Sequence, residues 1–220
     1  MRLELANTIF VFDLDDTLYS EFDYKESGMR EVARVVSGLY SLKKEDTLFD
    51  LMNGEGDVFD QVCSKIGAGK QMKESLIWVY RNHFPDISLD NSVSAFLAKL
   101  AENSLMVAIL TDGRSVTQRS KLRALGLKKI PAFISEEYSS EKPALKRFEI
   151  IQAHFPSADC VYIGDNPKKD FIGPSQLGWR TIGVRGNGRN IHSQDVSGFS
   201  EVYLPEIWID NIDEIGGLLC

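Results

Sequence analysis

The 220 residues suffice for one domain of good size, or for a core domain that carries a smaller insert. The chain has 25 lysine and arginine residues against 32 acidic ones, and its net charge of -7 argues against a nucleic-acid-binding protein. Because 43% of the residues are hydrophobic, a packed core is expected and disorder is not.

The three cysteines, Cys63, Cys160 and Cys220, lie far apart and show no spacing typical of a metal site. We expect them to be reduced thiols. The amino-terminal residues lack the pattern of a secretory signal, and no apolar run approaches the roughly 18 residues that span a membrane. These observations predict a soluble, cytoplasmic protein.

The first predicted element is a buried strand at residues 8–12, a run of apolar β-branched and aromatic residues. Three carboxylates follow it, from Asp13, Asp15 and Asp16. Because side chains alternate along an extended chain, Asp13 and Asp15 should point to the same side. Clustered carboxylates are tolerated mainly where a cation or a functional task offsets their repulsion. The alternative is an acidic turn after a strand.

Residues 20–85 show apolar residues at helical spacing and no convincing strand. The first helix is expected between about residues 26 and 40. The second follows a cap at Asp46 or Thr47, and the third has Asp57 as its N-cap. A fourth ends before the proline at position 85. The pattern therefore predicts an all-helical insert.

From residue 90 onward, strand and helix patterns alternate. Strands are predicted at residues 105–110, 132–134, 160–163, 180–184 and 207–209. Helices are predicted around residues 93–100, 116–125, 145–155, 168–177 and 212–219. This order favours right-handed βαβ units and an α/β, Rossmann-like, doubly wound parallel sheet. The core domain would comprise residues 1–19 and 86–220, and residues 20–85 would form the inserted helical domain.

Ligands of parallel α/β sheets bind outside the carboxyl ends of the strands, where this chain carries polar residues. Thr111 and Asp112 follow the strand at 105–110, and Lys142 stands beyond the next strand. Asp165 and Asp170 follow the strand at 160–163. Phosphoryl transfer requires such groups: oxygen ligands for Mg²⁺, a nucleophile, and donors for phosphate oxygens.

These segments resemble, in the same order, the four motifs of the haloacid dehalogenase-like (HAD) superfamily. Residues 12–18 (FDLDDTL) match its first motif, DxDx[TV], and Thr111 matches the second. Lys142 matches the third motif, and residues 164–170 (GDNPKKD) match the fourth. The helical insert corresponds to the C1-type cap of this family.

The resemblance implies a role for each motif residue. Asp13 would be the nucleophile that forms an aspartyl-phosphate. Asp15 would protonate the leaving group and later take a proton from water, a role that favours a raised pKa. The phosphoryl oxygens would be bound by Thr111, Lys142 and backbone N–H groups, including that of Asp112.

The resemblance also implies that Mg²⁺ is the cofactor. Asp13 and Asp165 would bind it directly, and Asp15 would bind it through the backbone carbonyl. Asp170 would reach the metal through water or would steady Lys142.

Other polar residues have less specific interpretations. Asp16 is expected to shape the turn after the first strand. Arg114 is either a solvated residue or a substrate contact. Residues 186–200 are expected to form a surface loop. The histidines share no ligand spacing and are expected to be ordinary surface or core residues: His83, His154 and His192.

The expected function is Mg²⁺-dependent hydrolysis of a small phosphomonoester, either a nucleoside monophosphate or a sugar or acyl-sugar phosphate. Asp15 favours this function because dehalogenases of the family lack a carboxylate at that position. A phosphomutase of the same fold is the alternative, followed by a non-catalytic binding module. The expected partner is a small phosphorylated metabolite, with no nucleic acid or membrane, and the sequence gives no oligomeric state.

Overall fold

The computed structural model describes residues 3–186 and 188–219. The chain divides into two compact units. The first, which we call the sheet unit, comprises Met1–Glu21 and Ser88–Cys220, and the second, the helical unit, is Phe22–Ile87.

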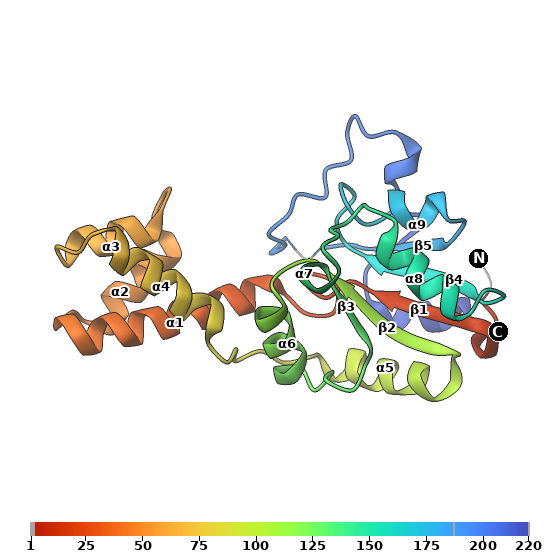
Figure 1. The fold of residues 1–220 in the computed structure, drawn as a ribbon, viewed down its shortest axis with the longest axis horizontal. Helices are drawn as coiled ribbons and strands as arrows, with labels where there is room; N and C mark the ends of the chain where they lie inside the picture. The colour runs from red at the N-terminus through yellow and green to blue at the C-terminus, as the bar shows by residue number, and fades with distance from the viewer. Residues whose placement is uncertain (1–2, 187, 220) are drawn as a thin grey trace. The chain divides into compact units, whose positions relative to one another are not determined.

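The sheet unit is built on six parallel strands in the order β3-β2-β1-β4-β5-β6 (Figure 1). They are β1 (Thr8–Phe12), β2 (Met106–Thr111), β3 (Ala132–Ile134), β4 (Asp159–Gly164), β5 (Arg180–Val184) and β6 (Ile207–Ile209). The chain adds β2 and β3 on one side of β1 and then returns to its other side with β4. Open α/β sheets bind ligands where the strand order reverses in this way, here between β1 and β4. The predicted parallel α/β sheet is confirmed.

The register of the central strands brings their carboxyl ends to one level. Phe12, the last residue of β1, pairs with Ile109 of β2 and with Ile163 of β4. The backbone N–H of Asp13 continues the pairing by donating to the Ile163 carbonyl at 2.8 Å. All residues of β1 are buried, so Asp13 is the first polar residue at this end of the central strand.

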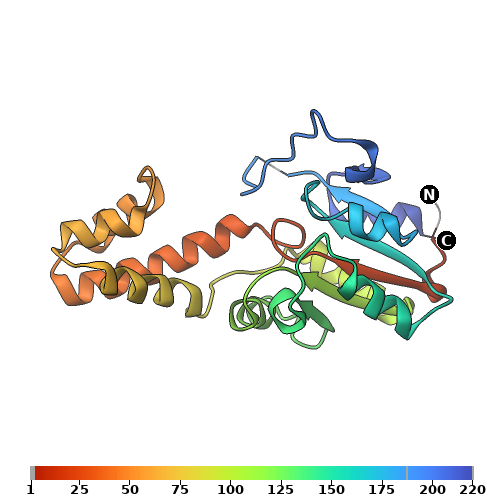
Figure 2. The same cartoon turned by 45° about the horizontal axis from the view of Figure 1, so that its top comes forward.

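Helices cover both faces of the sheet, and Figure 2 shows α8 and α9 in front of it and α5 behind it. The helices of the sheet unit are α5 (Asn91–Asn103), α6 (Ser115–Ala124), α7 (Ser135–Tyr138), α8 (Lys146–His154) and α9 (Ile172–Gln176). Phe148 and Ile151 of α8 belong to one buried cluster with side chains from β1, β2 and β4. The alternation of side chains along each strand supplies one such apolar face.

Two predicted helices of the sheet unit differ from the structure. In place of the helix expected at residues 168–177, the structure has α9, which is only five residues long. It starts later than expected because a turn that contains Asp165 and Asp170 precedes it. In that turn, the Asn166 carbonyl accepts the backbone N–H of Asp170 at 2.9 Å. The last helix, Ile212–Leu218, is a 3₁₀ helix.

The helical unit contains α1 (Glu21–Tyr40) from Phe22 onward, followed by α2 (Lys44–Asn53), α3 (Val58–Lys65) and α4 (Lys70–Asn82). Their apolar faces share one core, formed by Met29, Val32, Ala33, Val36, Leu51, Val62, Cys63 and Leu76. The Asp57 carboxylate accepts the N–H of Asp60 at 3.1 Å, which confirms the predicted N-cap of α3.

The predicted cap of α2 was wrong. This helix begins at Lys44 with Lys43 in the N-cap position, so Asp46 and Thr47 lie inside it. The Thr47 hydroxyl donates to the Lys43 carbonyl at 3.0 Å instead of capping the helix. The two acidic residues in the first turn, Glu45 and Asp46, still stabilise the helix start through the helix dipole.

None of the described helices combines the length and the apolar composition that a membrane span requires. Cys63 and Cys160 are buried free thiols, as predicted, and Cys220 lies outside the described residues.

Phe148 is a residue of α8 that packs against the sheet and is 0% exposed. Substituting it tests the core of the sheet unit. We expect Phe148→Ala to lower the free energy of unfolding by about 3–5 kcal/mol, because it leaves a cavity in a packed interior. Phe49→Ala is the matched control, since Phe49 is 67% exposed. Urea denaturation measures both variants, and equal effects would contradict the assignment of this core.

Candidate active site

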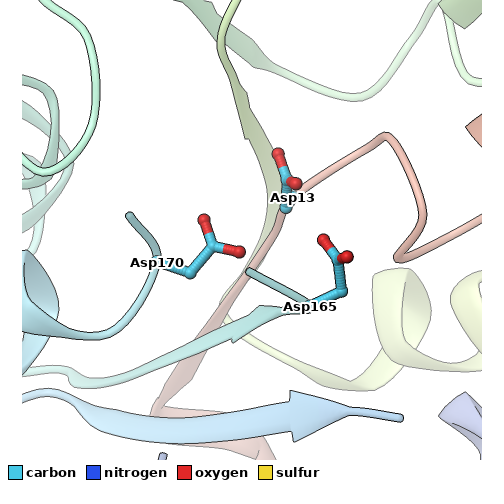
Figure 3. Close-up of side chains that lie close together, drawn as sticks. All are labelled: Asp13, Asp165 and Asp170. Atoms are coloured by element: carbon cyan, nitrogen blue, oxygen red, sulfur yellow. The ribbon is translucent and has the colours of Figure 1, made fainter. Parts of the chain in front are cut away.

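Three carboxylates converge at the carboxyl ends of β1 and β4. Asp13 directly follows β1, Asp165 directly follows β4, and Asp170 lies in the next turn. One oxygen from each lies within 4.8 Å of the others, and Figure 3 shows the three side chains meeting from their separate segments. All three residues are buried, with exposed fractions of 6%, 2% and 0%.

Lys142 is the cation at the centre of this group. Its Nζ lies 2.8 Å from Asp13 Oδ1 and 2.6 Å from Asp170 Oδ1. The ammonium also donates to the Tyr162 hydroxyl at 3.0 Å, and that hydroxyl lies 3.2 Å from Asp170 Oδ1. Lys142 lies in a turn, four residues before α8. One lysine therefore faces two of the three buried carboxylates.

Because three buried carboxyls share one lysine, the pKa values of these groups are shifted. Burial raises the pKa of Asp13 to about 7, against the opposing charge of Lys142 and with the added repulsion of Asp170. Burial also raises the pKa of Asp165 to about 8, and the charges of Asp170 and Asp13 add to the shift. Burial alone would lower the pKa of Lys142, but Asp13 and Asp170 raise it well above its usual value.

The donor set fits a magnesium ion. Mg²⁺ prefers oxygen ligands, and Asp13, Asp165 and Asp170 offer carboxylate oxygens. Among the described residues, the contacts of the Asp165 carboxylate are neutral: Asn190 Nδ2 at 2.9 Å and Thr17 Oγ1 at 3.5 Å. A buried carboxylate without a cationic partner is costly, so a bound cation would lower the free energy of this site.

Thr111 and Asp112 are fixed by a residue that sequence reasoning missed, Arg147. This arginine is 0% exposed, and its Nη1 donates to the carbonyls of Thr111 at 2.8 Å and Phe133 at 2.9 Å. Its Nη2 bonds the Asp112 carboxylate, which also accepts the backbone N–H of Lys142 at 3.2 Å. The arginine therefore links the ends of β2 and β3 to the turn that carries Lys142.

The Asp15 side chain is bonded by residues outside the three-carboxylate group. Its carboxylate lies 2.7 Å from Lys121 Nζ, accepts Gln118 Nε2 at 3.0 Å, and accepts the Tyr19 hydroxyl. Burial works to raise the pKa of Asp15, but the charge and hydrogen bond of Lys121, together with the hydrogen bonds from Tyr19 and Gln118, outweigh it and lower the pKa. The raised pKa expected for this residue is therefore not found in this arrangement. Its role as a metal ligand through the backbone carbonyl stays a prediction.

Asp16 shapes the turn after β1, as predicted. It adopts a left-handed backbone conformation with a φ of 54°. Its Oδ1 accepts the N–H of Glu21, the first residue of α1, at 2.8 Å, and its Oδ2 accepts the N–H of Ile191 at 2.7 Å.

A cavity of about 100 Å³ opens on these groups within the sheet unit. Its lining comprises Asp13, Asp15, Glu21, Thr111, Asp112, Lys142, Asp165, Asn166, Lys169 and His192. It contains six of the seven predicted site residues, and Asp170 lies behind it, bonded to Lys142. Arg114 is exposed just before α6 and does not line it.

His192 is an exposed residue, which agrees with the expected surface position. It lines this cavity because residues 188–194, which we call the strap, bend back over the sheet edge through hydrogen bonds to Asp16 and Asp165. Polar residues that follow a strand indicate a site, and the strap follows β5. The same criterion would therefore have pointed to the strap.

A family model described as haloacid dehalogenase-like hydrolase matches residues 10–184. The chain belongs to this family. The resemblance read from the four sequence motifs is thereby confirmed.

Several HAD relatives match most of the chain. Glyceraldehyde 3-phosphate phosphatase of Methanopyrus kandleri is 28% identical over 93% of this chain and 94% of its own. N-acylneuraminate-9-phosphatase of Homo sapiens is 24% identical over 86% of each chain. Ribulose-1,5-bisphosphate 5-phosphatase of Halopiger xanaduensis is 30% identical over 78% of this chain and 70% of its own.

A solved structure of the HAD hydrolase YfnB from Bacillus subtilis, bound to magnesium, has the same fold. It aligns with a TM-score of 0.61 at 16% identity, over 99% of both chains.

Removing the cation beside Asp15 in this HAD hydrolase should change the ionisation of that carboxyl. We expect Lys121→Met to raise the pKa of Asp15, because Lys121 supplies the largest lowering effect on a carboxyl that burial pushes upward. Lys121→Arg, which keeps the charge, is the control and should leave the pKa low. Carbon-13 NMR of the Asp15 carboxyl measures it, and an unchanged pKa in Lys121→Met would contradict this explanation.

Proposed function

We propose that this HAD hydrolase is a Mg²⁺-dependent phosphatase that hydrolyses a small phosphomonoester through an aspartyl-phosphate. The observation that carries the proposal is the buried Asp13 carboxylate, held 2.8 Å from Lys142 beside Asp165 and Asp170. The relatives named above support the reaction class, since each is named as a phosphatase of a small phosphorylated compound.

Asp13 is the nucleophile in this proposal. An Asp13 oxygen forms a bond to phosphorus while the bond from phosphorus to the leaving oxygen breaks. The backbone N–H bond to Ile163 and the ion pair with Lys142 hold this carboxylate in place. A carboxylate attacks an anionic phosphoryl group only where positive charge offsets the repulsion. Mg²⁺, held by Asp13, Asp165, Asp170 and the backbone carbonyl of Asp15, would supply the part of that charge that Lys142 does not.

The phosphoryl oxygens meet donors from three strand ends. Thr111 and Lys142 both line the cavity, and the Thr111 backbone is fixed by Arg147. Backbone N–H groups of Leu14, Asp15 and Asp112 would complete the set. Prearranged donors of this kind stabilise a transferring phosphoryl group because they need no reorganisation during the reaction.

Asp15 moves the protons. In the first step it gives a proton to the leaving oxygen, and in the second it takes one from the water that attacks the aspartyl-phosphate. Its lowered pKa keeps it ionised near neutral pH, the form needed in the second step. The first step needs the protonated form, which the low pKa of this arrangement disfavours; the proton that Asp15 takes from water in the second step restores that form for the next cycle.

We further propose that residues 20–85 are the C1-type cap of this family and that the core domain comprises residues 1–19 and 86–220. The substrate is a small phosphorylated metabolite, with sugar-related phosphates favoured by the names of the relatives.

The test is hydrolysis of p-nitrophenyl phosphate and of a panel of phosphorylated metabolites, with Mg²⁺ and with excess EDTA. We expect activity with Mg²⁺ only, and a loss of about 10³-fold or more in Asp13→Asn, since the amide is a far weaker nucleophile. Asp159→Asn makes the same change at an exposed residue at the opposite end of β4 and should keep full activity. Activity that persists in EDTA, or in a folded Asp13→Asn variant, would refute the proposal.

A further inference from the structure

The strap, residues 188–194, is held against the candidate site by side-chain bonds on both sides of His192. Asn190 Nδ2 donates to Asp165 Oδ2 at 2.9 Å, and the Ile191 N–H donates to Asp16 Oδ2 at 2.7 Å. On the other side, Gln194 Nε2 donates to the carbonyls of Asp165 at 2.7 Å and Val184 at 2.8 Å. Residues flanking His192 are thus tied to two of the segments that carry the carboxylates.

The sequence before the strap is adapted to this path. A Cβ atom on Gly186 would lie 2.0 Å from Asn190 Oδ1, so any other residue at this position would displace the Asn190 amide. The Gly186 N–H also donates to Gln194 Oε1 at 2.7 Å, and the Gln194 side chain therefore uses both its donor and its acceptor. Ordering a polar loop costs conformational entropy, and these bonds offset it.

The strap places His192 in the cavity lining together with Glu21 and Lys169. The Asp16 carboxylate accepts the N–H groups of both Glu21 and Ile191, so Glu21 and the strap are neighbours. Lys169 Nζ lies 3.9 Å from Asp112 Oδ2.

The same cavity is lined by Lys142 and Thr111, the proposed donors for a phosphoryl group. An ionised Glu21 would repel phosphate oxygens, so the part of the cavity beside Glu21 and the strap suits a different part of the substrate. That part is the leaving group, which extends away from the phosphorus.

The three side chains offer complementary hydrogen bonds. A glutamate accepts, a lysine donates, and an imidazole does either, depending on its tautomer. A hydroxyl group both donates and accepts, so it satisfies an acceptor and a donor together. We propose that His192 is a specificity-determining residue that hydrogen-bonds a hydroxyl group of the leaving group. The substrates would then be phosphate esters of small hydroxylated compounds. This proposal rests on the proposed phosphatase function.

The test compares kcat/KM of His192→Ala on two kinds of ester in the presence of Mg²⁺. Glyceraldehyde 3-phosphate and ribose 5-phosphate carry hydroxyl groups on the leaving group, whereas p-nitrophenyl phosphate carries none. We expect His192→Ala to lower kcat/KM about tenfold on the hydroxylated esters and less than about twofold on p-nitrophenyl phosphate, as loss of one hydrogen bond implies. His192→Gln keeps a donor and an acceptor and should recover most of the loss.

Ser193→Ala is the matched control, because Ser193 is the exposed neighbour in the strap and does not line the cavity. It should leave both activities unchanged, and thermal melts verify that every variant is folded. Three results would overturn the role of His192 without contradicting the phosphatase function. They are equal effects of His192→Ala on both kinds of ester, no effect on either, and turnover of p-nitrophenyl phosphate alone by the wild type. A wild-type protein that hydrolyses neither ester overturns the phosphatase itself.

Discussion

Three buried carboxylates, from Asp13, Asp165 and Asp170, repel one another at the centre of the site. Lys142 relieves this repulsion in part. Two ion pairs of 2.8 Å and 2.6 Å bring the lysine against Asp13 and Asp170, while the contacts of Asp165 among the described residues are neutral. Such an arrangement is unfavourable by itself and becomes favourable with a cation. The strand order produces it, since β1 and β4 are neighbours whose carboxyl ends meet.

The rest of the site keeps these groups in place. Tyr162 bonds both Lys142 and Asp170 from within β4, and the Asn166 N–H donates to Asp170 Oδ2 at 2.8 Å. Gly164 leaves room for that carboxylate, because a Cβ atom there would lie 2.5 Å from Asp170 Oδ2. These contacts favour one geometry of the carboxylates, which is what a metal site requires.

The strands and the motif residues were predictable because their signals are local. An apolar run predicts a buried strand such as β1, and the residue after it, Asp13, must then stand at the sheet edge. Contacts made by distant segments left no local signal. Lys121 and Gln118 look like ordinary residues of α6, yet they determine the ionisation of Asp15. His192 lies in a loop whose path depends on hydrogen bonds to residues more than twenty positions away.

Isothermal titration with Mg²⁺ in buffers of different ionisation enthalpy tests whether the three buried carboxylates form a metal site. The pKa values of about 7 for Asp13 and about 8 for Asp165 leave these carboxyls partly protonated at pH 7, and Mg²⁺ binds only their ionised forms. Binding at pH 7 should therefore release roughly one proton, so that the observed enthalpy depends on the buffer, and this dependence should disappear at pH 9. Absence of Mg²⁺ binding would show that these carboxylates do not form a magnesium site. An enthalpy at pH 7 that is the same in every buffer would show that they are not protonated before Mg²⁺ binds.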